Sequence, residues 1–489
     1  MFRGADISQK TTIQGSNAAR ETRNSRMAQI IMSPYLSLFV IIMLLSVGGI
    51  ASGELLSGRY GNLGSYAIAA MVGLVALAIT LILRQDGVAL VMVLATRVYV
   101  DWYLGLGLVA QPMAIILLTV LYLTRSAQRP WRQPQVLWLW LLMLIIALYP
   151  ASHGLGFPDE VYYYSNVFLS AFLMFWLGQV MARDASSIKR LLNFVALFAA
   201  LIALHSIIEY TTGKMLFSTS SYDSYLASVS NYTIAYGSNV FRTGSFFVNP
   251  DSAGGFFSMT LLIPLGLFAN SSSLLAKVGH LAEIALILLA VMFTYSTESW
   301  LAVGAGTFIF LLLVGKTSYR FLLLALVGCI AFVVPVLFPT QLALQLQHIS
   351  APNELLLRTG AWKTGLNVIQ NFPLAGLGLG RHVYLLLADP YRVLEQYRPL
   401  DHPHNSFLEI AALGGIPLVL TFIALLLLSF WRAWRSWLKA DPQTRSLIAG
   451  CIASAAALTS YSMSDAGWTL APLLVIGWLM LGVASSRRA

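Results

Sequence analysis

The chain has 489 residues, of which 58% are apolar and 10% are charged, and its net charge is +10. Soluble domains average nearer ~45–50% apolar and ~25% charged residues, and a mean hydropathy of +0.74 leaves too few polar residues to cover a soluble fold. The composition excludes a cytosolic enzyme, a disulfide-rich secreted protein and a nucleic-acid-binding protein. It indicates a polytopic membrane protein whose basic excess lies in cytoplasmic loops.

Apolar segments of membrane-spanning length recur along the chain. A helix needs ~20 mostly apolar residues to cross a bilayer, within a range of ~17–25. By this criterion the predicted spans are 34–52, 64–83, 87–103, 107–124, 135–150, 163–182, 191–209, 252–269, 279–296, 299–315, 321–338, 404–431, 446–463 and 467–485. The two spans between 87 and 124 are short and can instead form a re-entrant pair. We therefore predict an all-α integral membrane protein with 12–14 transmembrane helices and a large periplasmic loop that carries short helices.

The basic residues orient these spans. With both termini in the cytoplasm, most of the 30 Lys and Arg residues fall on the cytoplasmic side, as the positive-inside rule requires. Residues 1–33 are polar without apolar periodicity, which predicts a disordered cytosolic tail, and residues 34–485 then form a single transmembrane domain. A cleavable signal peptide is the less favoured alternative, because the polar leader is long. Cys329 and Cys451 lie in apolar segments, so no disulfide or cysteine metal site is expected.

Two predicted periplasmic loops, 210–251 and 339–403, are too long to be simple connections. Loops of more than ~12–15 residues in compact folds are usually functional or disordered. The first loop carries Arg242, and the second carries Arg358 and Arg381. Basic residues on the outer side run against the positive-inside bias, so we expect them to serve an anionic substrate at the outer face.

The second loop contains a helical pattern followed by a glycine run. Asn353 can cap a helix that ends before Phe372 and Pro373, with Arg358 and Trp362 on one face. This helix can lie along the membrane interface with Trp362 at headgroup depth, or it can pack against the rest of the loop.

Glycines then alternate with leucines over residues 376–380, and Arg381 follows them. A glycine run outside a strand–helix unit does not predict a dinucleotide site. Glycines do permit a tight backbone nest that presents N–H groups to an anion, with Gly378 and Gly380 as its candidates. The alternative is close packing of the loop.

The segment Asp401–Glu409, with the sequence DHPHNSFLE, re-enters the membrane. Ser406 and Glu409 have the spacing of a capping box, which predicts a helix start whose positive end faces the outer surface and favours an anion. A nearby helix N-terminus disfavours imidazolium, so we expect His404 to be neutral near pH 7 and able to accept a proton. The alternatives are a polar cap role for His404 and a capping role alone for Glu409.

Three stretches carry a family resemblance. The sequence RTGAWKTGLNVIQNFPLAGLGLG at 358–380, followed by HPHNSFLEIAALGGIP at 402–417, resembles the O-antigen ligase and polysaccharide polymerase family. The earlier FRTGSFFVNPDSAGGFF at 241–257 is similar to the Asn-Pro motif of that family. Together these stretches define an O-antigen ligase-like region at residues 240–430.

The resemblance implies glycan transfer at the periplasmic face of the bacterial inner membrane. The donor would be an oligosaccharide on undecaprenyl diphosphate, and the acceptor would be another lipid-linked glycan or the lipid A core. The resemblance implies no metal and no cofactor, and no nucleic acid takes part. Membrane lipids are expected partners, and a chain-length regulator or a flippase is a further candidate.

Candidate roles follow from this reaction. Expulsion of a diphosphate requires positioned cations or N–H donors, and guanidinium groups match phosphate oxygens. We assign general-base catalysis with inversion to His404, as the attacking hydroxyl must lose a proton. The diphosphate candidates are Arg242, Arg358 and Arg381, and the supporting candidates are Trp362, Asn405, Glu409, Gly378 and Gly380.

Two departures from the family pattern bear on the function. Thr297 and Glu298 follow Ser296, where family members often carry an arginine. Leu418 stands where ligases tend to have a small residue or tyrosine, which favours a polymerase slightly, as do the two long outer loops. The alternatives are an O-antigen ligase and a glycolipid transporter or flippase. A transporter would place its polar groups near the bilayer midplane in repeated halves, and no repeat is evident.

Overall fold

The protein is described here by a computed structural model, which covers residues 134–153, 159–213, 241–247, 249–314, 352–396 and 399–486, with isolated positions at 115, 336, 339, 340, 342, 343 and 346. The chain divides into two compact units, 1–92 and 93–489, and every described residue belongs to the second. The predicted tail 1–33 and the predicted spans 34–52, 64–83, 87–103, 107–124 and 321–338 lie outside the described residues, apart from positions 115 and 336.

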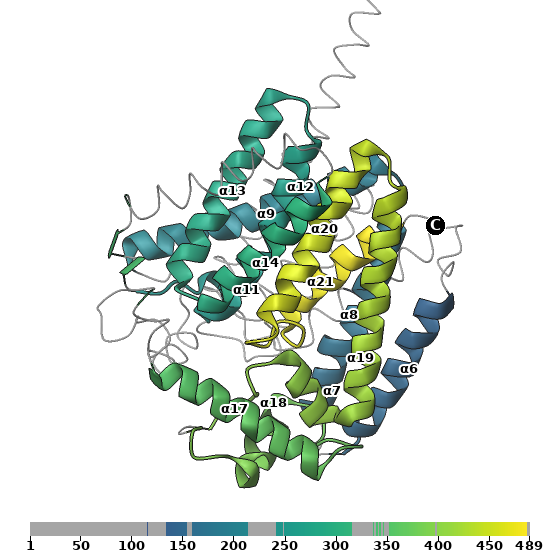
Figure 1. Cartoon of the computed structure of the whole chain (residues 1–489), viewed down its shortest axis with the longest axis vertical. Coiled ribbons are helices and arrows are strands. Elements are labelled where there is room, and N and C mark those ends of the chain that lie inside the picture. Colours follow the sequence, from purple (N-terminus) through teal and green to yellow (C-terminus); the bar gives the residue numbers. More distant parts are fainter. Residues whose placement is uncertain are drawn as a thin grey trace, which may run out of the picture. The chain divides into compact units, whose positions relative to one another are not determined.

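The elements within the described residues are all helical (Figure 1). In chain order they are α6 (Pro134–Ala151), α7 (Asp159–Tyr163), the π-helix η3 (Tyr164–Leu169), α8 (Ser170–Met181), α9 (Ala185–Thr212), the 3₁₀-helix η5 (Ser245–Phe247), α11 (Pro250–Thr260), α12 (Leu262–Asn270), α13 (Leu274–Thr294), α14 (Thr297–Leu313), α17 (Pro352–Asn371), α18 (Arg381–Leu387), the 3₁₀-helix η6 (Asp389–Tyr391), α19 (Ser406–Lys439), α20 (Pro442–Tyr461) and α21 (Ala471–Ala484).

Five helical stretches are long and apolar enough to cross a membrane: Glu160–Met181, Ala185–Thr212, Pro250–Asn270, Leu274–Thr294 and Ser406–Lys439. Shorter apolar helices at Val136–Ala151, Thr297–Leu313 and Ala471–Ala484 accompany them. The predicted spans that fall on described residues are therefore helical, and the prediction of an all-α polytopic membrane protein is confirmed.

Small residues allow the apolar helices to approach closely. A Cβ atom on Gly178 of α8 would lie 2.6 Å from the Leu479 carbonyl oxygen of α21, and one on Gly266 of α12 would lie 2.9 Å from the Ser446 oxygen of α20. Membrane helices lack a hydrophobic force between them and depend on such packing. These two crossings hold α20 and α21, whose connection reaches the candidate site, against the rest of the bundle.

Helix α19 is kinked, and N–H groups of the glycine run bond to the α19 carbonyls that lack a partner within the helix. Gly415 has a φ of 78°, and Pro417 has no N–H to offer the carbonyl of Leu413. Gly378 donates its N–H to that carbonyl instead, at 3.0 Å, while Leu377 donates to the Ala412 carbonyl at 2.9 Å. The packing alternative for the glycine run is therefore supported, because the Gly378 N–H that a nest would need is already used.

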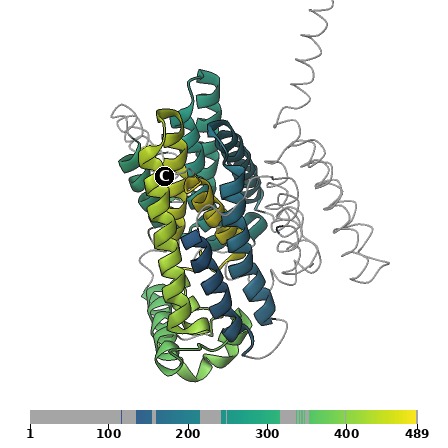
Figure 2. The same cartoon turned by 90° about the vertical axis from the view of Figure 1, so that its right-hand side faces the viewer.

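The second long loop contains α17, α18 and η6. Figures 1 and 2 show α17 and α18 at the end of the helical unit where α19 begins. The helix predicted in this loop is present and ends at Asn371, before Phe372 and Pro373. It begins at Pro352, so the prediction that Asn353 caps it was wrong.

Candidate functional site

His404 lies at the turn that leads into α19, in a backbone conformation that is rare for histidine. Its φ is 49°, in the left-handed region where residues other than glycine are strained and where functional residues often occur. The indole N–H of Trp362 on α17 donates to the His404 carbonyl at 3.2 Å. Trp362 therefore faces the histidine motif, which supports the packing alternative for α17.

Asn405, not Ser406, caps α19, so the predicted capping box was wrong. The Asn405 side-chain oxygen accepts the N–H groups of Phe407 at 2.9 Å and Leu408 at 3.1 Å, as an N-cap side chain does. The Ser406 hydroxyl instead accepts the N–H of Trp468 at 3.0 Å. Because Glu409 has no capping role, its carboxylate is available for the cluster described below.

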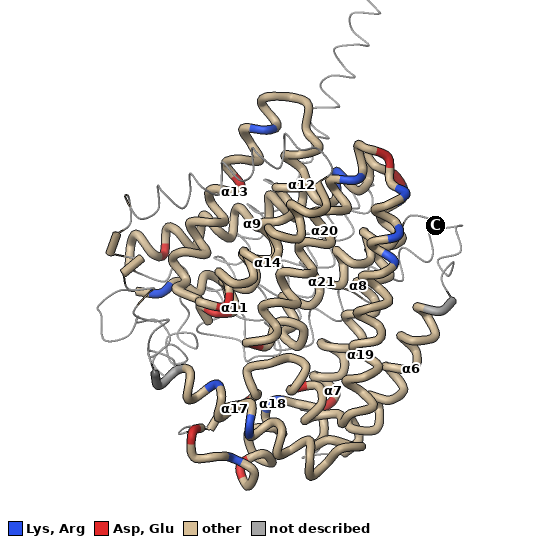
Figure 3. The backbone as a smooth tube through the Cα atoms, viewed as in Figure 1, with Lys and Arg blue, Asp and Glu red and all other residues tan. Residues whose placement is uncertain are grey.

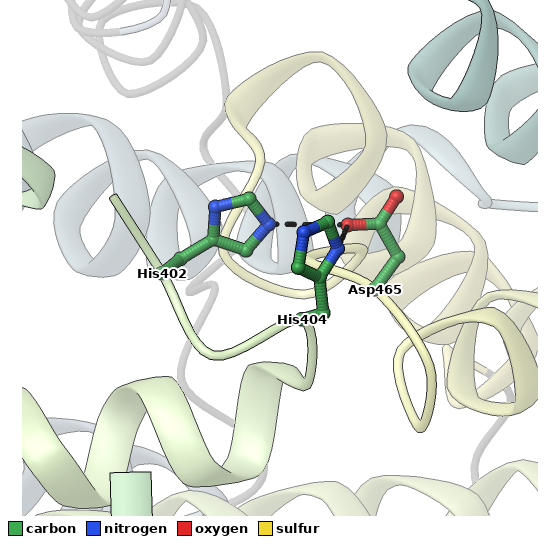
Figure 4. A group of neighbouring side chains, drawn as sticks. All are labelled: His402, His404 and Asp465. Atoms are coloured by element: carbon green, nitrogen blue, oxygen red, sulfur yellow. Dashed lines mark hydrogen bonds and ion pairs between the residues drawn. The ribbon is translucent and has the colours of Figure 1, made fainter. Parts of the chain in front are cut away.

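Asp465, in the connection between α20 and α21, faces both histidines of the motif (Figure 4). Its Oδ1 lies 3.3 Å from Nε2 of His402 and 3.5 Å from Nδ1 of His404. Asp465 is held in turn by the Tyr461 hydroxyl, 2.6 Å from Oδ2, and by the Ala466 N–H, 2.8 Å from Oδ1. The site therefore joins the segment before α19 to a segment some sixty residues later in the chain.

Sequence reasoning missed Asp465 and His402. Asp465 is the only acidic residue after Asp441, and it lies in the connection between the last two predicted spans. An isolated carboxylate between two apolar spans could have been recognised as a candidate site residue. The sequence does not show that this connection lies close to the start of α19.

His402 lies between two carboxylates. Its Nδ1 is 2.6 Å from Asp401 and its Nε2 is 3.3 Å from Asp465. Burial and the charge of Arg381 lower the pKa of His402, but Asp401 and Asp465 outweigh them and raise it to about 9. His402 is therefore an imidazolium at neutral pH.

The pKa of His404 is shifted in the opposite direction. Burial lowers it most, and the positive charge of His402 lowers it further, while Asp465 opposes both. His404 is therefore neutral near pH 7, as the sequence led us to expect, although we had attributed this to the helix N-terminus. Burial raises the pKa of Asp465, but its contacts with the two histidines hold the pKa well below the ordinary value.

His402, His404 and Asp465 are also close enough together to hold a metal ion, since their ligand atoms lie within 4.8 Å of one another. Two observations disfavour a cation here. Both ring nitrogens of His402 already contact carboxylates, and the charges of Arg381 and Arg358 act on His402 and His404 respectively. The geometry suits two histidines that share one aspartate better than a metal centre.

Arg381, at the start of α18, pairs with Glu409. Its Nε lies 3.3 Å from Oε1 of the fully buried Glu409, which also accepts the hydroxyl of Tyr163 at 2.9 Å, while Oε2 accepts that of Thr469 at 2.6 Å. Within the part of the chain that the structure describes, Nη2 of Arg381 is buried without a hydrogen-bond partner. Gly380, with a φ of 125°, sets the turn that places Arg381.

Arg358 on α17 pairs with Glu298 on α14. Glu298 is buried and also accepts the Ser296 hydroxyl at 3.1 Å. The residue that departs from the family pattern therefore compensates the charge of a candidate phosphate-binding arginine. The contact also fastens α17 to the transmembrane helices, because α14 is one of the apolar helices.

Arg242 is buried, and its guanidinium is engaged on two sides. Nε donates to the Thr294 carbonyl at 2.9 Å, and Nη2 donates to Asp251 at 2.7 Å. The hydroxyl of Tyr461 lies 2.7 Å from the Asp251 carbonyl oxygen and 2.6 Å from Asp465. Arg242 is thus connected to the histidines through Tyr461, whereas Arg358 and Arg381 act on them electrostatically.

One comparison with known proteins found a match. A family model described as O-Antigen ligase matches residues 283–423, which include Glu298, Arg358, Arg381, His404 and Glu409. The match leaves out two parts of the site, the segment around Arg242 and the connection that carries Asp465. No curated protein matches the chain in a sequence search.

Proposed function

We propose that this chain, whose residues 283–423 match a family model described as O-Antigen ligase, belongs to that family and polymerises oligosaccharides linked to undecaprenyl diphosphate. The reaction takes place at the periplasmic face of the bacterial inner membrane and needs no metal. The observation that carries the proposal is the contact between His404 and Asp465, beside Arg358 and Arg381. The contact places a neutral base against a carboxylate, and the charges of Arg381 and Arg358 act on His402 and His404. The displacement of a diphosphate requires a base and cations together.

His404 is the general base in this proposal. Its Nδ1 faces Asp465, which leaves Nε2 for the attacking hydroxyl. Nε2 takes the hydroxyl proton as the oxygen forms a bond to the anomeric carbon, and the bond from that carbon to the diphosphate oxygen breaks with its electron pair. A single displacement of this kind inverts the anomeric centre. Asp465 stabilises the imidazolium that forms at His404 and fixes its orientation.

The arginines contribute unequally to diphosphate binding. Arg381 contacts Glu409 through Nε and keeps Nη2 without a partner among the described residues, so it can offer a hydrogen bond to a phosphate oxygen. Arg358 pairs with Glu298 while its side chain remains about a fifth exposed, at 21%. Arg242 uses both Nε and Nη2 in buried contacts. We therefore rank Arg381 first, Arg358 second and Arg242 last.

The supporting residues position this machinery. Asn405 caps α19, and its amide donates to the Met463 carbonyl at 2.8 Å, which draws the Asp465 connection towards the histidines. Trp362 fixes the His404 backbone, and Glu409 orients Arg381. Gly378 ties the second loop to the kink of α19.

The O-antigen ligase is the second candidate, because the matching family model carries that description. Leu418, which favoured a polymerase, is fully buried beside Gly414, so it fills the kink of α19 and does not line an acceptor site. The preference for a polymerase then depends on the two long outer loops, 210–251 and 339–403.

One experiment separates the candidate functions. The purified protein is incubated with a defined undecaprenyl-diphosphate oligosaccharide, with and without a lipid A-core acceptor. Lengthening without the core indicates a polymerase, and product formed only with the core indicates a ligase. If neither forms while the glycolipid crosses proteoliposomes, the protein is a transporter. His404→Ala should abolish product, whereas His382→Ala, at an exposed histidine of α18, should not.

A further inference from the structure

The end of α19 remote from His404 presents an aromatic and basic surface. Trp431, Trp434, Arg435, Leu438 and Lys439 are all exposed, and their spacings of three and four residues place them on one side of the helix. We call these five residues the interfacial face. Figure 3 shows the cations of this segment at the end of α19 that lies away from α17 and α18.

The interfacial face continues a lipid-facing stripe. Leu420 is 59% exposed and Leu427 is 64% exposed, and they lie on the same side of α19 as Trp431, as expected from their spacing. At ~1.5 Å per residue, Trp431 lies about 37 Å along the helix from Ser406, and the hydrocarbon core is ~30 Å thick. Trp431 and Trp434 therefore fall at the water interface of the leaflet opposite to His404, where tryptophan rings concentrate.

The charge of this region is strongly positive. Arg435 lies over the ring of Trp431, with its guanidinium carbon 5.2 Å from the ring centroid, and Arg445 lies 5.6 Å over Trp437. Asp441 is the only acidic residue between Glu409 and Asp465, and its carboxylate is engaged in capping α20 through the Thr444 N–H at 2.8 Å. In the part of the chain that the structure describes, neither Arg435 nor Lys439 forms an ion pair with a carboxylate.

We propose that the interfacial face binds the headgroup of an anionic phospholipid, with its acyl chains along Leu420 and Leu427. A guanidinium held over an indole ring presents its N–H groups sideways to a phosphate. The continuous apolar stripe selects a lipid over a free phosphate, because a free anion would leave Leu427 and the tryptophans uncovered. This inference does not depend on the reaction at His404.

The test measures lipid retention on the purified full-length protein by native mass spectrometry. The protein in detergent is titrated with phosphatidylglycerol, with phosphatidylcholine, or with glycerol phosphate. We expect selective retention of phosphatidylglycerol. Because each basic residue at an anionic surface contributes about 1 kcal/mol, Arg435→Gln should weaken retention about five-fold, and R435Q/K439Q about thirty-fold.

The control is R183Q/R190Q, which removes two exposed cations near the start of α9 and should leave retention unchanged. Thermal unfolding of each variant establishes that it is folded, and Arg435→Lys, which keeps the charge, should retain more lipid than Arg435→Gln. The proposal is overturned if phosphatidylcholine or glycerol phosphate binds as well as phosphatidylglycerol. It is also overturned if R435Q/K439Q retains as much phosphatidylglycerol as the control.

Discussion

Asp465 reaches His404 from a different part of the chain, with its Oδ1 3.5 Å from Nδ1 of the imidazole. The same carboxylate oxygen contacts His402 at 3.3 Å. One aspartate therefore faces a charged imidazole and a neutral one. The proposed reaction uses the neutral one, which is kept neutral by its burial and by the charge of the other imidazole.

Replacing Asp465 tests its proposed role as the positioning residue for His404. Asp465→Asn keeps the shape of the side chain but removes the charge that stabilises imidazolium at His404, so turnover should fall by about 10²–10⁴-fold. The measurement is the initial rate of glycan lengthening, with glycolipid binding followed separately. Ser464→Ala, at the adjacent position, serves as the control. Turnover near that of the wild type would remove Asp465 from the mechanism.

The pH dependence of turnover reports on His404. Burial and the charge of His402 hold the pKa of His404 below its ordinary value of 6.5, and only the neutral form accepts a proton. Turnover should therefore rise with pH through that lowered pKa and level off by about pH 7. In His402→Gln the neighbouring charge is lost, so the rising limb should move to higher pH. If the rising part of the pH–turnover curve stays at the same pH in this variant, the charge of His402 does not lower the pKa of His404.

The pH dependence of stability reports on His402. Its pKa is raised to about 9 in the folded protein from an ordinary 6.5, so its stabilising contribution is complete below pH 6.5 and is lost as the pH rises through about 9. The thermal midpoint should therefore decline between about pH 7 and 10. His402→Gln should make the decline shallower, and His382→Gln should not. The measurement is intrinsic-fluorescence unfolding in detergent.

Arg381→Lys tests the ranking of the arginines. Lysine preserves the charge beside Glu409 but loses the second donor that Nη2 provides, so kcat/KM for the lipid-linked donor should fall at least about ten-fold, the equivalent of one charge-assisted hydrogen bond. Arg242→Lys disturbs a buried pair with Asp251 and should lower the thermal midpoint more than it lowers kcat/KM. The reverse pattern would reverse the ranking.

The glycine run offers a structural test. Gly376 has a φ of 65°, and a Cβ atom there would lie 2.3 Å from the carbonyl of Leu413. Gly376→Ala should therefore destabilise the fold by more than the ~1–2 kcal/mol of a left-handed backbone alone, and it should also reduce turnover by loosening Arg381. Gly279→Ala, in α13 with no atom within 4 Å of its Cβ position, should be neutral or stabilising, as measured by thermal unfolding.

Among the described residues, hydropathy predicted where the long apolar helices lie, because burial in lipid imposes a long apolar run on a spanning helix. Local signals were less reliable at helix starts. Asn405 and Ser406 are both good caps, and the sequence does not tell which of them takes the position. The ends of α17 show the same asymmetry, since Pro373 marks its end, while its start lies two residues earlier than an Asn353 cap predicts.

Long-range partners could not be predicted. The pairs Arg358–Glu298, Arg381–Glu409 and His404–Asp465 depend on how helices pack, and no local spacing encodes that. The sequence did mark most of the participants, because charged residues are rare in this chain. It could not tell that each proposed phosphate-binding arginine already has a carboxylate partner.

The hydrogen bond that the Gly378 N–H donates to the Leu413 carbonyl fixes the second long loop to α19. Lifting the loop would break the bonds that replace those lost at Pro417, so it cannot act as a freely swinging cover. In the proposed reaction, a glycan that reaches His404 therefore meets a loop that is fixed to the kink of α19 through Leu377 and Gly378.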